Sequence, residues 1–333
     1  MKLLYLSCHS ILEYDELRIF NELGIDVFSH GAYHNPQNLD DKKRPPLDLP
    51  FHKQFSDNTL LYPKENIEPE LIKWADTIIC MHVGDWLMRN WIKMKGKRII
   101  LRTIGQSTME DESTLRWMRR EGLEIVRYSP HENTIPGFLG ADATIRFAKK
   151  PEEFGPWNGQ KMQVITVGQS MKQRDFSCNY TIFEKATLDY PRKVFGPHNE
   201  GLGETYGGCP DYAGLREEMS RAMLYFYTGT YPASYTLNFI EAAMTGLPMV
   251  ALGDYLGNGP DFQAQQTYEV AELLHKYDAG LTGDTVAQLR AGVDALFSQP
   301  DLRKKFSKNI REMAVDLFAH DKIKAQWKNY LGL

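Results

Sequence analysis

The chain has 333 residues, of which 42% are hydrophobic and 25% charged, an ordinary composition for a globular protein. This length predicts two domains, because it exceeds what one hydrophobic core usually serves. The formal net charge of −4 argues against a protein that coats nucleic acid or an anionic membrane with its whole surface. The four cysteines form no CxxC pair and no zinc-ligand spacing, so we expect reduced thiols and no metal site.

The N-terminal apolar run, Met1–Leu6, turns polar at Ser7 and lacks the apolar core and cleavage site of a secretory signal. No stretch approaches the roughly 20 apolar residues that span a bilayer. We therefore expect a cytoplasmic protein without an integral membrane segment, and a peripheral position if it acts at a membrane surface.

Short apolar runs of strand length alternate with amphipathic stretches of helix length. The first predicted helix covers Leu12–Leu23 and ends before Gly24, where a C-terminal glycine is expected. The predicted strands are Lys2–Leu6, Ile25–Phe28, Thr77–Met81, Arg98–Leu101, Glu124–Tyr128, Met162–Val167, Lys193–Phe195, Ala222–Tyr227 and Pro248–Leu252. This alternation predicts an α/β fold in which helices cover both faces of parallel sheets.

Two segments interrupt the alternation. His34–Pro69 holds six prolines and a charged run, which predicts a long surface loop, either functional or merely an insertion. Lys149–Gly159 is rich in proline, glycine and charge and precedes a new series of strands. We place the boundary there, between an N-terminal domain at 1–155 and a second domain at 160–315. Two such sheets would face a central cleft, with ligands at the carboxyl ends of their strands.

The most informative segment is Ala222–Leu252. An apolar strand leads through a Gly/Pro/Ser loop into a helix that carries Glu241 and stops at Gly246. The free N–H groups at a helix start favour a phosphate, and a glutamate one to two turns later can accept hydrogen bonds from a ribose diol. The alternative is a helix with one exposed glutamate.

The same segment resembles the donor-binding signature of two-domain GT-B glycosyltransferases, particularly the retaining family 4. Glu241, Ala242, Gly246 and Pro248 fall in the register of its Glu-Ala-x-x-x-Gly-x-Pro motif. The resemblance implies two Rossmann-like domains facing a cleft and a C-terminal helix, 316–333, that crosses back to the first domain. It assigns the ribose to Glu241 and the donor sugar and diphosphate to the backbone of Thr236, Leu237 and Asn238. The first glutamate of that family's pair would fall at Ala233, so the resemblance leaves the sugar open.

A second match opens the C-terminal half. The strand that ends at Gly168 is followed by Lys172 and Arg174, which resembles the segment that neutralises the donor diphosphate in that family. The sequence does not rank the two cations. His198, after the next predicted strand, occupies the place where these enzymes pack the nucleobase. A solvated basic turn is the alternative for Lys172 and Arg174.

In the N-terminal half, the strand that ends at Met81 resembles the family's strand with a histidine near the transferred sugar. His82 would hydrogen-bond that sugar, and Asp85 would serve as an acceptor contact or base; a structural histidine is the alternative for His82. His9 and Ser10 occupy the place of the family's acceptor loop but lack its glycines.

Six basic residues and no acidic one lie between Arg89 and Arg102, beside Trp86 and Trp91. Arg89 is our candidate from this run for an acceptor that bears phosphate, either a lipid-linked sugar or a nucleic acid. A solvated helix end is the alternative.

The resemblance implies a hexosyl- or glycosyltransferase that moves a sugar from a nucleotide-sugar donor to a hydroxyl of a glycan, a lipid-linked sugar or a modified nucleic acid. It implies retention of configuration, no metal, and no cofactor besides the nucleotide-diphosphate sugar as co-substrate. Two alternatives stay open. One is a nucleotide-sugar epimerase or phosphorylase of the same fold, and the other is a nucleotide-sugar binding protein without catalysis.

Overall fold

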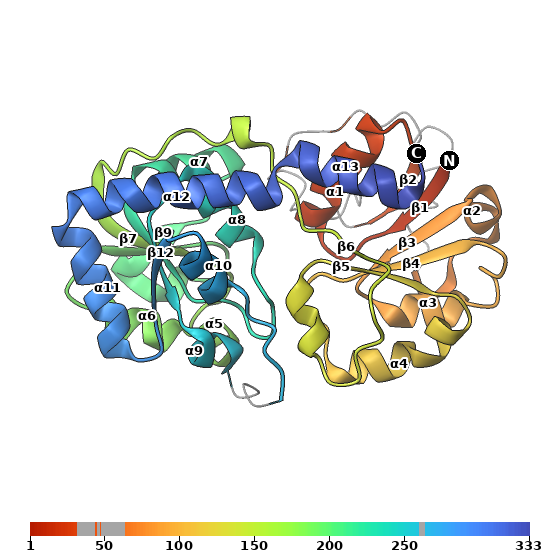
Figure 1. The fold of residues 1–333 in the computed structure, drawn as a ribbon, viewed down its shortest axis with the longest axis horizontal. Helices are drawn as coiled ribbons and strands as arrows, with labels where there is room; N and C mark the ends of the chain where they lie inside the picture. Colours follow the sequence, from red (N-terminus) through yellow and green to blue (C-terminus); the bar gives the residue numbers. More distant parts are fainter. Residues whose placement is uncertain (32–43, 45–46, 48–63, 260–263) are drawn as a thin grey trace. The chain divides into compact units, whose positions relative to one another are not determined.

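The computed structural model describes residues 1–31, 44, 47, 64–259 and 264–333, and its chain forms two compact units. Unit 1 comprises Met1–Ala148 and His320–Leu333, and unit 2 comprises Lys149–Ala319 (Figure 1). Each unit holds a six-stranded sheet in which every pair is parallel, with helices packed on it. The predicted α/β class with two Rossmann-like domains is confirmed. Most of the predicted loop at His34–Pro69 lies outside the described residues.

Unit 1 has the strand order β2-β1-β3-β4-β5-β6. Its strands are β1 (Lys2–Leu6), β2 (Asp26–His30), β3 (Thr77–Met81), β4 (Arg98–Arg102), β5 (Glu124–Arg127) and β6 (Ala143–Thr144). Its helices are α1 (Ser10–Glu22), α2 (Pro69–Trp74), α3 (Gly84–Asn90), α4 (Met109–Arg120) and α13 (His320–Leu331), with short 3-10 turns at Lys64–Asn66 and Pro130–Thr134.

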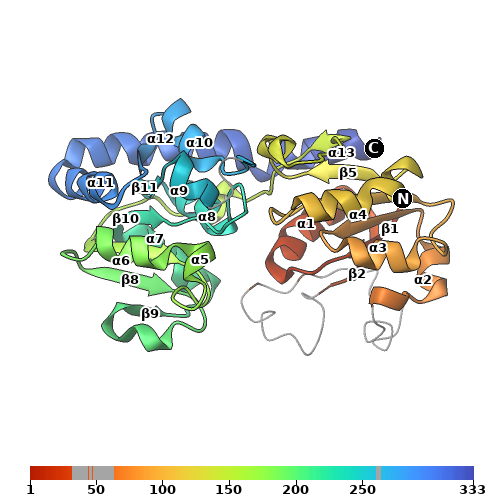
Figure 2. The same cartoon turned by 90° about the horizontal axis from the view of Figure 1, so that it is seen from below.

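Helices α1 and α13 cover one face of this sheet, and α3 and α4 lie side by side on the other (Figures 1 and 2). The helix α13 is fixed by Trp327, which is fully buried and meets the ring of Phe20 edge-on at 5.2 Å. Under it, the buried guanidinium of Arg102 donates to Glu16 at 2.8 Å and stacks on Phe147. The C-terminal helix is therefore an integral part of the core of unit 1.

Unit 2 has the strand order β12-β11-β10-β7-β8-β9. Its strands are β7 (Lys161–Val167), β8 (Arg192–Phe195), β9 (Tyr206–Gly208), β10 (Ala222–Tyr227), β11 (Met249–Leu252) and β12 (Gly280–Gly283). Its helices are α5 (Asp175–Cys178), α6 (Tyr180–Ala186), α7 (Tyr212–Arg221), α8 (Leu237–Thr245), α9 (Asp254–Asn258), α10 (Val270–Lys276), α11 (Val286–Ser298) and α12 (Pro300–Phe318), with 3-10 turns at Pro151–Glu153 and Glu200–Thr205.

The long helix α12 packs against α8, and α11 packs against α6. The strands of the centre, β10 and β11, are buried along their whole length, as their continuous apolar sequence requires. Gly246 ends α8 in the left-handed conformation, with φ of 76°, as the sequence predicted. Gly24 likewise follows α1 with a φ of 68°.

All nine predicted strands are present, within two residues of their predicted ends. The strands that the sequence did not predict are β6, β9 and β12. The strand β6 has two residues, β9 is the tripeptide Tyr-Gly-Gly, and β12 is the tetrapeptide Gly-Leu-Thr-Gly. Such short or glycine-rich segments carry no strand signal of their own and pair because a neighbouring strand is already in place.

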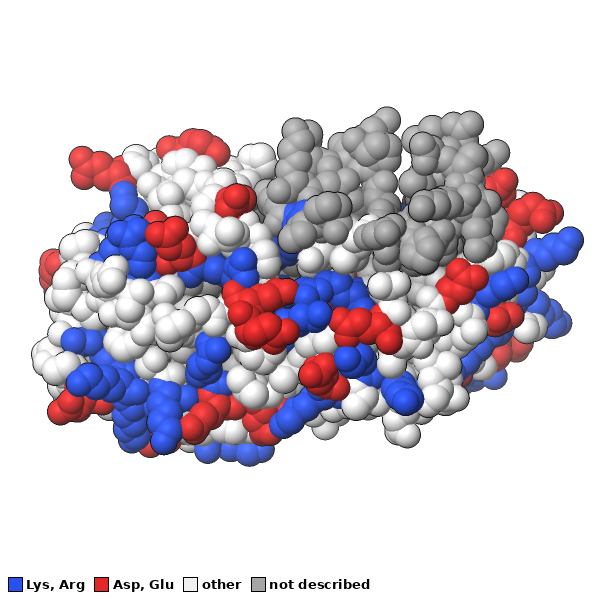
Figure 3. Space-filling model, turned by 90° about the horizontal axis from the view of Figure 1, so that it is seen from above, with Lys and Arg blue, Asp and Glu red and all other residues white. Residues whose placement is uncertain are grey.

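The distribution of charged side chains over the surface agrees with the small net charge of −4. On the face drawn in Figure 3, acidic and basic side chains are interspersed over the described residues. No helix in the described part of the chain combines the length and the apolar character needed to cross a membrane.

We predict that Trp327→Ala lowers the free energy of unfolding of unit 1 by about 3–5 kcal/mol, because it empties the space of a fully buried indole. Amide hydrogen exchange in α13 and β1 under denaturant measures the loss. The exposed neighbour Lys328 provides the control, and Lys328→Ala should change the value by less than about 0.5 kcal/mol. A loss below about 1 kcal/mol in Trp327→Ala would contradict the docked position of α13.

Candidate functional site

Each sheet has one point where the order in which the chain adds strands changes direction, and we call it the reversal point. In unit 2 it lies between β7 and β10, because the chain leaves β7 towards β8 and leaves β10 towards β11. In unit 1 it lies between β1 and β3. Ligands of open parallel sheets bind at such points, at the carboxyl ends of the strands. The residues that follow these four strands therefore form the candidate site of each unit.

The loops after β7 and β8 in unit 2 are joined by Asn199, whose side chain is buried. Its Nδ2 donates to the carbonyl oxygens of Gly168 at 2.7 Å and Gly196 at 3.0 Å, and its Oδ1 accepts from Met171 N at 2.8 Å. A Cβ at Gly196 would lie 2.5 Å from Gly168 O, so the two loops approach as closely as glycine permits. Asn199 was not among the predicted residues, since an asparagine after Gly-Pro-His carries no distinctive signal.

The predicted diphosphate residues lie on the first of these loops. Lys172 is exposed and Arg174 is half-buried, and the guanidinium of Arg174 donates to the carbonyl of Gln169 at 3.5 Å. Among the described residues, neither cation has a carboxylate partner. Their charge is available to a ligand at the end of β7. His198 lies exposed on the second loop, in the left-handed conformation with φ of 60°.

The helix α8 begins at the same point of the sheet. Its N-cap residue, Thr236, makes no side-chain cap hydrogen bond, so the N–H groups of the first turn are not capped by it. Asn238 donates from Nδ2 to Val167 O at 3.2 Å, which ties the start of α8 to the end of β7. The structure thus brings Thr236, Leu237 and Asn238 beside the loop that carries Lys172 and Arg174.

Glu241 lies in the second turn of α8 and is buried in an ion pair. Its Oε1 lies 2.8 Å from Nζ of Lys149, and the side chains are 4% and 1% exposed, respectively. Neither the sequence pattern nor the resemblance predicted this partner. The charge of Glu241 also adds to the burial that raises the pKa of Tyr225 on β10. The alternative of an exposed helix glutamate is excluded, because the side chain is buried. A buried carboxylate requires a partner, and Lys149 provides it.

Lys149 is the first residue of unit 2. Its backbone N–H donates to Phe318 O at 2.9 Å, and Lys149 forms a parallel bridge with Ala319, the last residue of the unit. The two segments by which the chain enters and leaves unit 2 are therefore paired at Lys149. Through its ammonium group, the same residue is bound to Glu241.

Ala233 occupies the place of the missing glutamate. The residue is 7% exposed, and its N–H donates to Thr230 O at 2.7 Å within the loop before α8. The position therefore offers no side-chain acceptor to a ligand.

In unit 1 the loop after β1 contacts the end of β3. Ser7 Oγ lies 3.5 Å from Met81 Sδ, and Cys8 Sγ donates to Met81 O at 3.5 Å. The structure therefore brings the predicted residues His9, Ser10 and His82 to the reversal point of this sheet.

His82 has a strained backbone. It is a non-glycine residue with φ of 63°, and Val83 N donates to Met81 O at 2.7 Å across it, which closes a three-residue turn. Such turns occur at functional sites more than elsewhere, because their cost must be offset by the surrounding structure. Burial lowers the pKa of His82 below its ordinary value of 6.5, against a smaller opposite effect of Asp111. The imidazole is therefore neutral at pH 7.

The remaining predicted residues of unit 1 have local structural partners. His9 is the N-cap of α1 and accepts from Leu12 N through Nδ1 at 3.4 Å, and Ser10 is buried in the first turn. Asp85 accepts from Nε of Arg89 at 2.6 Å, one helical turn away on α3. Arg89 thus shares its charge with a carboxylate, unlike Lys172 and Arg174 in unit 2.

Lys64 is a half-buried cation at this point that the sequence did not single out. It donates to Ser7 O at 2.8 Å and lies 4.5 Å from the ring centroid of Trp86. Burial lowers its pKa, which Glu13 and Cys8 partly offset. Burial also raises the pKa of Cys8 to about 11, so this cysteine is a thiol at neutral pH and not a nucleophile.

The side chains of Glu22, His320 and Asp321 are the group of potential metal ligands in the described part of unit 1, with ligand atoms within 4.8 Å of one another. Lys324 donates to Glu22 at 2.8 Å and to Asp321 at 2.9 Å. Because the Lys324 ammonium already pairs with both carboxylates, the group fits a structural contact between α13 and α1 better than a metal site.

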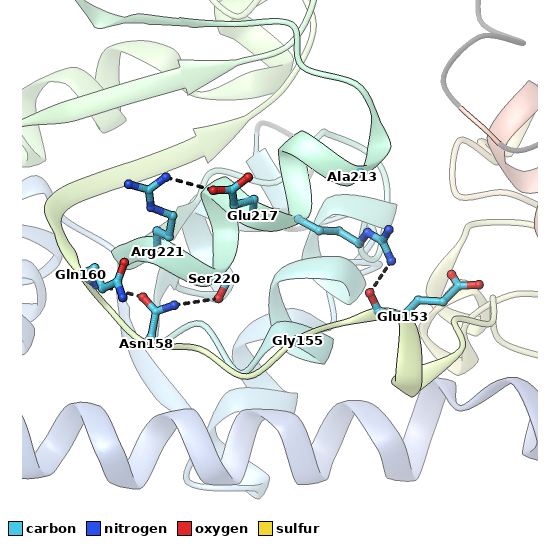
Figure 4. Close-up of a pocket in the computed structure, with 9 residues that line it drawn as sticks. Glu153, Gly155, Asn158, Gln160, Ala213, Glu217, Ser220 and Arg221 are labelled. Carbon is cyan, nitrogen blue, oxygen red and sulfur yellow. Dashed lines mark hydrogen bonds and ion pairs between the residues drawn. The ribbon is translucent and has the colours of Figure 1, made fainter.

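A groove of about 450 Å³ lies elsewhere in unit 2, between the segment at 153–160 and α7 (Figure 4). Its polar groups bind one another: Arg221 pairs with Glu217 at 3.0 Å, and Asn158 donates to Ser220 at 3.2 Å. Arg221, which lines the groove, directly precedes β10. The groove therefore lies at the amino ends of the strands, whereas the candidate site lies at their carboxyl ends.

The neutral state of His82 can be tested by titration. We expect its imidazole proton resonances to report a pKa below 6.5, and Asp111→Asn to lower that pKa further, because Asp111 favours the charged form. As pH falls below 6.5 the unfolded chain takes up the proton first, so stability that is present above 6.5 is lost relative to His82→Gln. A pKa at or above 6.5 would contradict the dominance of burial over the charge of Asp111.

The chain is similar to known proteins in its fold and not in its sequence. No protein-family model and no curated protein matches the chain by sequence. Among solved structures, a sucrose-phosphate synthase from Thermosynechococcus elongatus superposes with a TM-score of 0.73 at 15% identity, over 99% of this chain and 98% of that one. HepE of Anabaena, in complex with UDP and glucose, gives 0.66 at 12% identity, over 100% and 99% of the two chains.

A glycosyltransferase from Rickettsia africae gives a TM-score of 0.68 at 12% identity, over 99% of this chain and 98% of that one. The predicted GT-B resemblance is confirmed at the level of the fold, and the narrower likeness to family 4 stays a prediction. The similarity extends over the whole length of both partners in each pair, so the chain has the GT-B glycosyltransferase fold.

Proposed function

We propose that the protein transfers a sugar from a nucleotide-diphosphate donor to a hydroxyl group, with the donor on unit 2 and the acceptor on unit 1. The observation that carries this proposal is the meeting of the α8 N-terminus with Lys172 and Arg174 at the reversal point of the unit 2 sheet. It supplies uncompensated positive charge and backbone donors at one place.

That charge suits the demands of the reaction. Breaking the bond between the sugar C1 and the donor phosphate oxygen leaves negative charge on the diphosphate, which fixed donors must stabilise. We assign this role to the first turn of α8 at Thr236–Asn238, to Lys172 and Arg174, and to the close backbone at Gly168. In a retaining reaction without a metal, the acceptor oxygen attacks C1 from the side of the leaving group, and its proton passes to the departing phosphate oxygen.

Glu241 is the proposed ligand of the ribose. A carboxylate has about four acceptor positions, so an ammonium partner alone does not exhaust it. Lys149 fixes the carboxylate in one orientation and keeps it ionised, and an ionised acceptor binds a hydroxyl about twice as strongly as a neutral one. His198 is proposed to lie beside the nucleobase.

On unit 1, His82 is proposed to give the transferred sugar a hydrogen bond from a neutral imidazole, and His9, Ser10 and Arg89 to contact the acceptor. Asp85 is the proposed base or acceptor contact. The acceptor is a glycan, a lipid-linked sugar or a modified nucleic acid. Because HepE, similar in fold, binds UDP and UDP-glucose, uridine nucleotides are the first donors to test.

Ala233 favours a second candidate, a nucleotide-sugar binding protein without catalysis, because a donor sugar finds no carboxylate there. Tight donor binding without turnover on any acceptor would establish it. Consumption of donor without an acceptor would instead indicate an epimerase or a phosphorylase.

The ribose assignment predicts discrimination at the 2′-hydroxyl. By calorimetry, the wild-type protein should bind UDP more tightly than 2′-deoxy-UDP. Glu241→Ala should lower the affinity for UDP by roughly 100-fold, because two hydrogen bonds to a charged group are worth about 3 kcal/mol together. Glu241→Ala should bind the two nucleotides equally. This loss of discrimination separates a ribose contact from a purely structural role.

The matched control is Glu217→Ala, which removes an exposed carboxylate paired with Arg221 on α7 and should leave both affinities unchanged. Full discrimination in Glu241→Ala would refute the assignment of the ribose to this residue.

The buried pair predicts a large stability effect. Lys149→Met should lower the free energy of unfolding of unit 2 by about 3–5 kcal/mol, because it removes the ammonium group that lies 2.8 Å from the buried carboxylate of Glu241, and the double variant Lys149→Met/Glu241→Leu should recover most of that loss. Lys161→Met, which breaks a partly exposed pair with Glu218, should cost no more than about 1 kcal/mol. Equal costs for the two single variants would contradict the buried pairing.

A further inference from the structure

The turn after α3 and the adjacent face of α4 carry exposed apolar side chains that the fold of unit 1 does not use. Ile92 is 88% exposed, the highest value for a large hydrophobic side chain in the described chain. Met88, one helical turn earlier, is 40% exposed, and Trp117 on α4 is 42% exposed. Trp91 and Trp117 touch edge-on at 5.5 Å, which joins the two elements into one surface. We call these four residues, with the cations described next, the α3–α4 surface.

Four cations flank the apolar group. Lys93 and Lys95 follow Ile92 in the turn, and Arg116 and Arg120 flank Trp117 on α4; all are exposed. Lys93 donates to the amide oxygen of Asn66. None of the four has a carboxylate partner among the described residues, in contrast to Arg89, Arg98 and Arg119, which pair with Asp85, Glu124 and Asp142.

Two of the acidic side chains of α4 are engaged within the fold: Asp111 accepts from Thr108 N, and the buried Glu112 pairs with Arg127. Those that remain exposed lie at the helix ends. Asp85 is paired in the first turn of α3, Glu110 lies in the first turn of α4, and Glu121 follows the last turn. The surface therefore combines unpaired positive charge with two indoles and an aliphatic side chain at the tip of a turn. It lies on the face of the sheet opposite α1 and α13 (Figures 1 and 2).

We propose that the α3–α4 surface docks on an anionic membrane surface. Ile92 and Met88 enter the boundary between headgroups and acyl chains, the indoles of Trp91 and Trp117 lie at headgroup level, and the four cations meet the lipid phosphates. A nucleic acid would use the cations but gives an aliphatic tip nothing to pack against. An acidic protein partner would use the cations, but a lone exposed turn tip provides only a small apolar contact for one. The proposal concerns unit 1 alone and does not depend on the proposed reaction.

The test is flotation of the full chain with vesicles of phosphatidylcholine, alone or mixed with phosphatidylglycerol. We expect binding only to the mixed vesicles, released by salt because the cations are screened. Ile92→Glu should weaken binding at least about tenfold, through loss of a buried aliphatic side chain. Lys93→Glu/Lys95→Glu should weaken it by roughly 25-fold or more, at about fivefold for each cation.

The matched controls lie in unit 2. Phe176→Glu removes a side chain that is 82% exposed, and Lys304→Glu/Lys308→Glu makes the same charge change on α12; both should bind as the wild type does. Unchanged circular dichroism spectra and melting temperatures in the variants of the α3–α4 surface show that they are folded, so this test is decided whether or not the chain binds UDP. The proposal is overturned if the surface variants and the controls float alike, if phosphatidylcholine alone suffices, or if the chain binds duplex RNA through Lys93 and Lys95 but no vesicle.

Discussion

The buried ion pair between Lys149 and Glu241 is the interaction on which the organisation of unit 2 depends. Glu241 lies on the helix that begins at the reversal point of the sheet, and Lys149 lies where the two chain crossings into and out of the unit are paired. Two desolvated charges are stable only together, so the position of each fixes the other. The pair thus connects the helix of the candidate nucleotide site to the segments by which the chain enters and leaves unit 2.

Parallel sheet topology explains why distant residues meet. The loops after β7, β8 and β10 follow strands that end at Val167, Phe195 and Tyr227, yet Asn199 and Asn238 bind them to one another through backbone carbonyls. In unit 1, the same rule brings the loop after β1 to the strained turn at His82. Among the residues predicted to bind phosphate, Lys172 and Arg174 in unit 2 have no carboxylate partner in the described chain, whereas Arg89 in unit 1 pairs with Asp85. This difference favours the donor diphosphate on unit 2.

The fold could be predicted because its strands are continuous apolar runs and its helices end at glycines such as Gly24 and Gly246. The candidate site was predictable where a local pattern carries it, as in the helix from Thr236 to Glu241 or the histidine directly after β3. The partners of the site residues could not be predicted, because Lys149 lies 92 residues from Glu241 and nothing in the sequence around it marks it as a partner. Asn199 and Lys64 were missed for the same reason, since their roles arise only from contacts between loops. The basic run from Arg89 to Arg102 looked uniform in sequence, but its three arginines pair with carboxylates. Its three lysines have no carboxylate partner among the residues that the structure describes, and Lys97 donates to backbone carbonyls.

The measurement that tests the central claim most directly is amide hydrogen exchange of the full chain with and without UDP. If the nucleotide binds at the reversal point of the unit 2 sheet, protection should appear together at 168–171, 196–199 and 236–241, because the three segments form one site. Protection confined to 153–160 and 213–221, around the groove at the opposite edge of the sheet, would contradict the account.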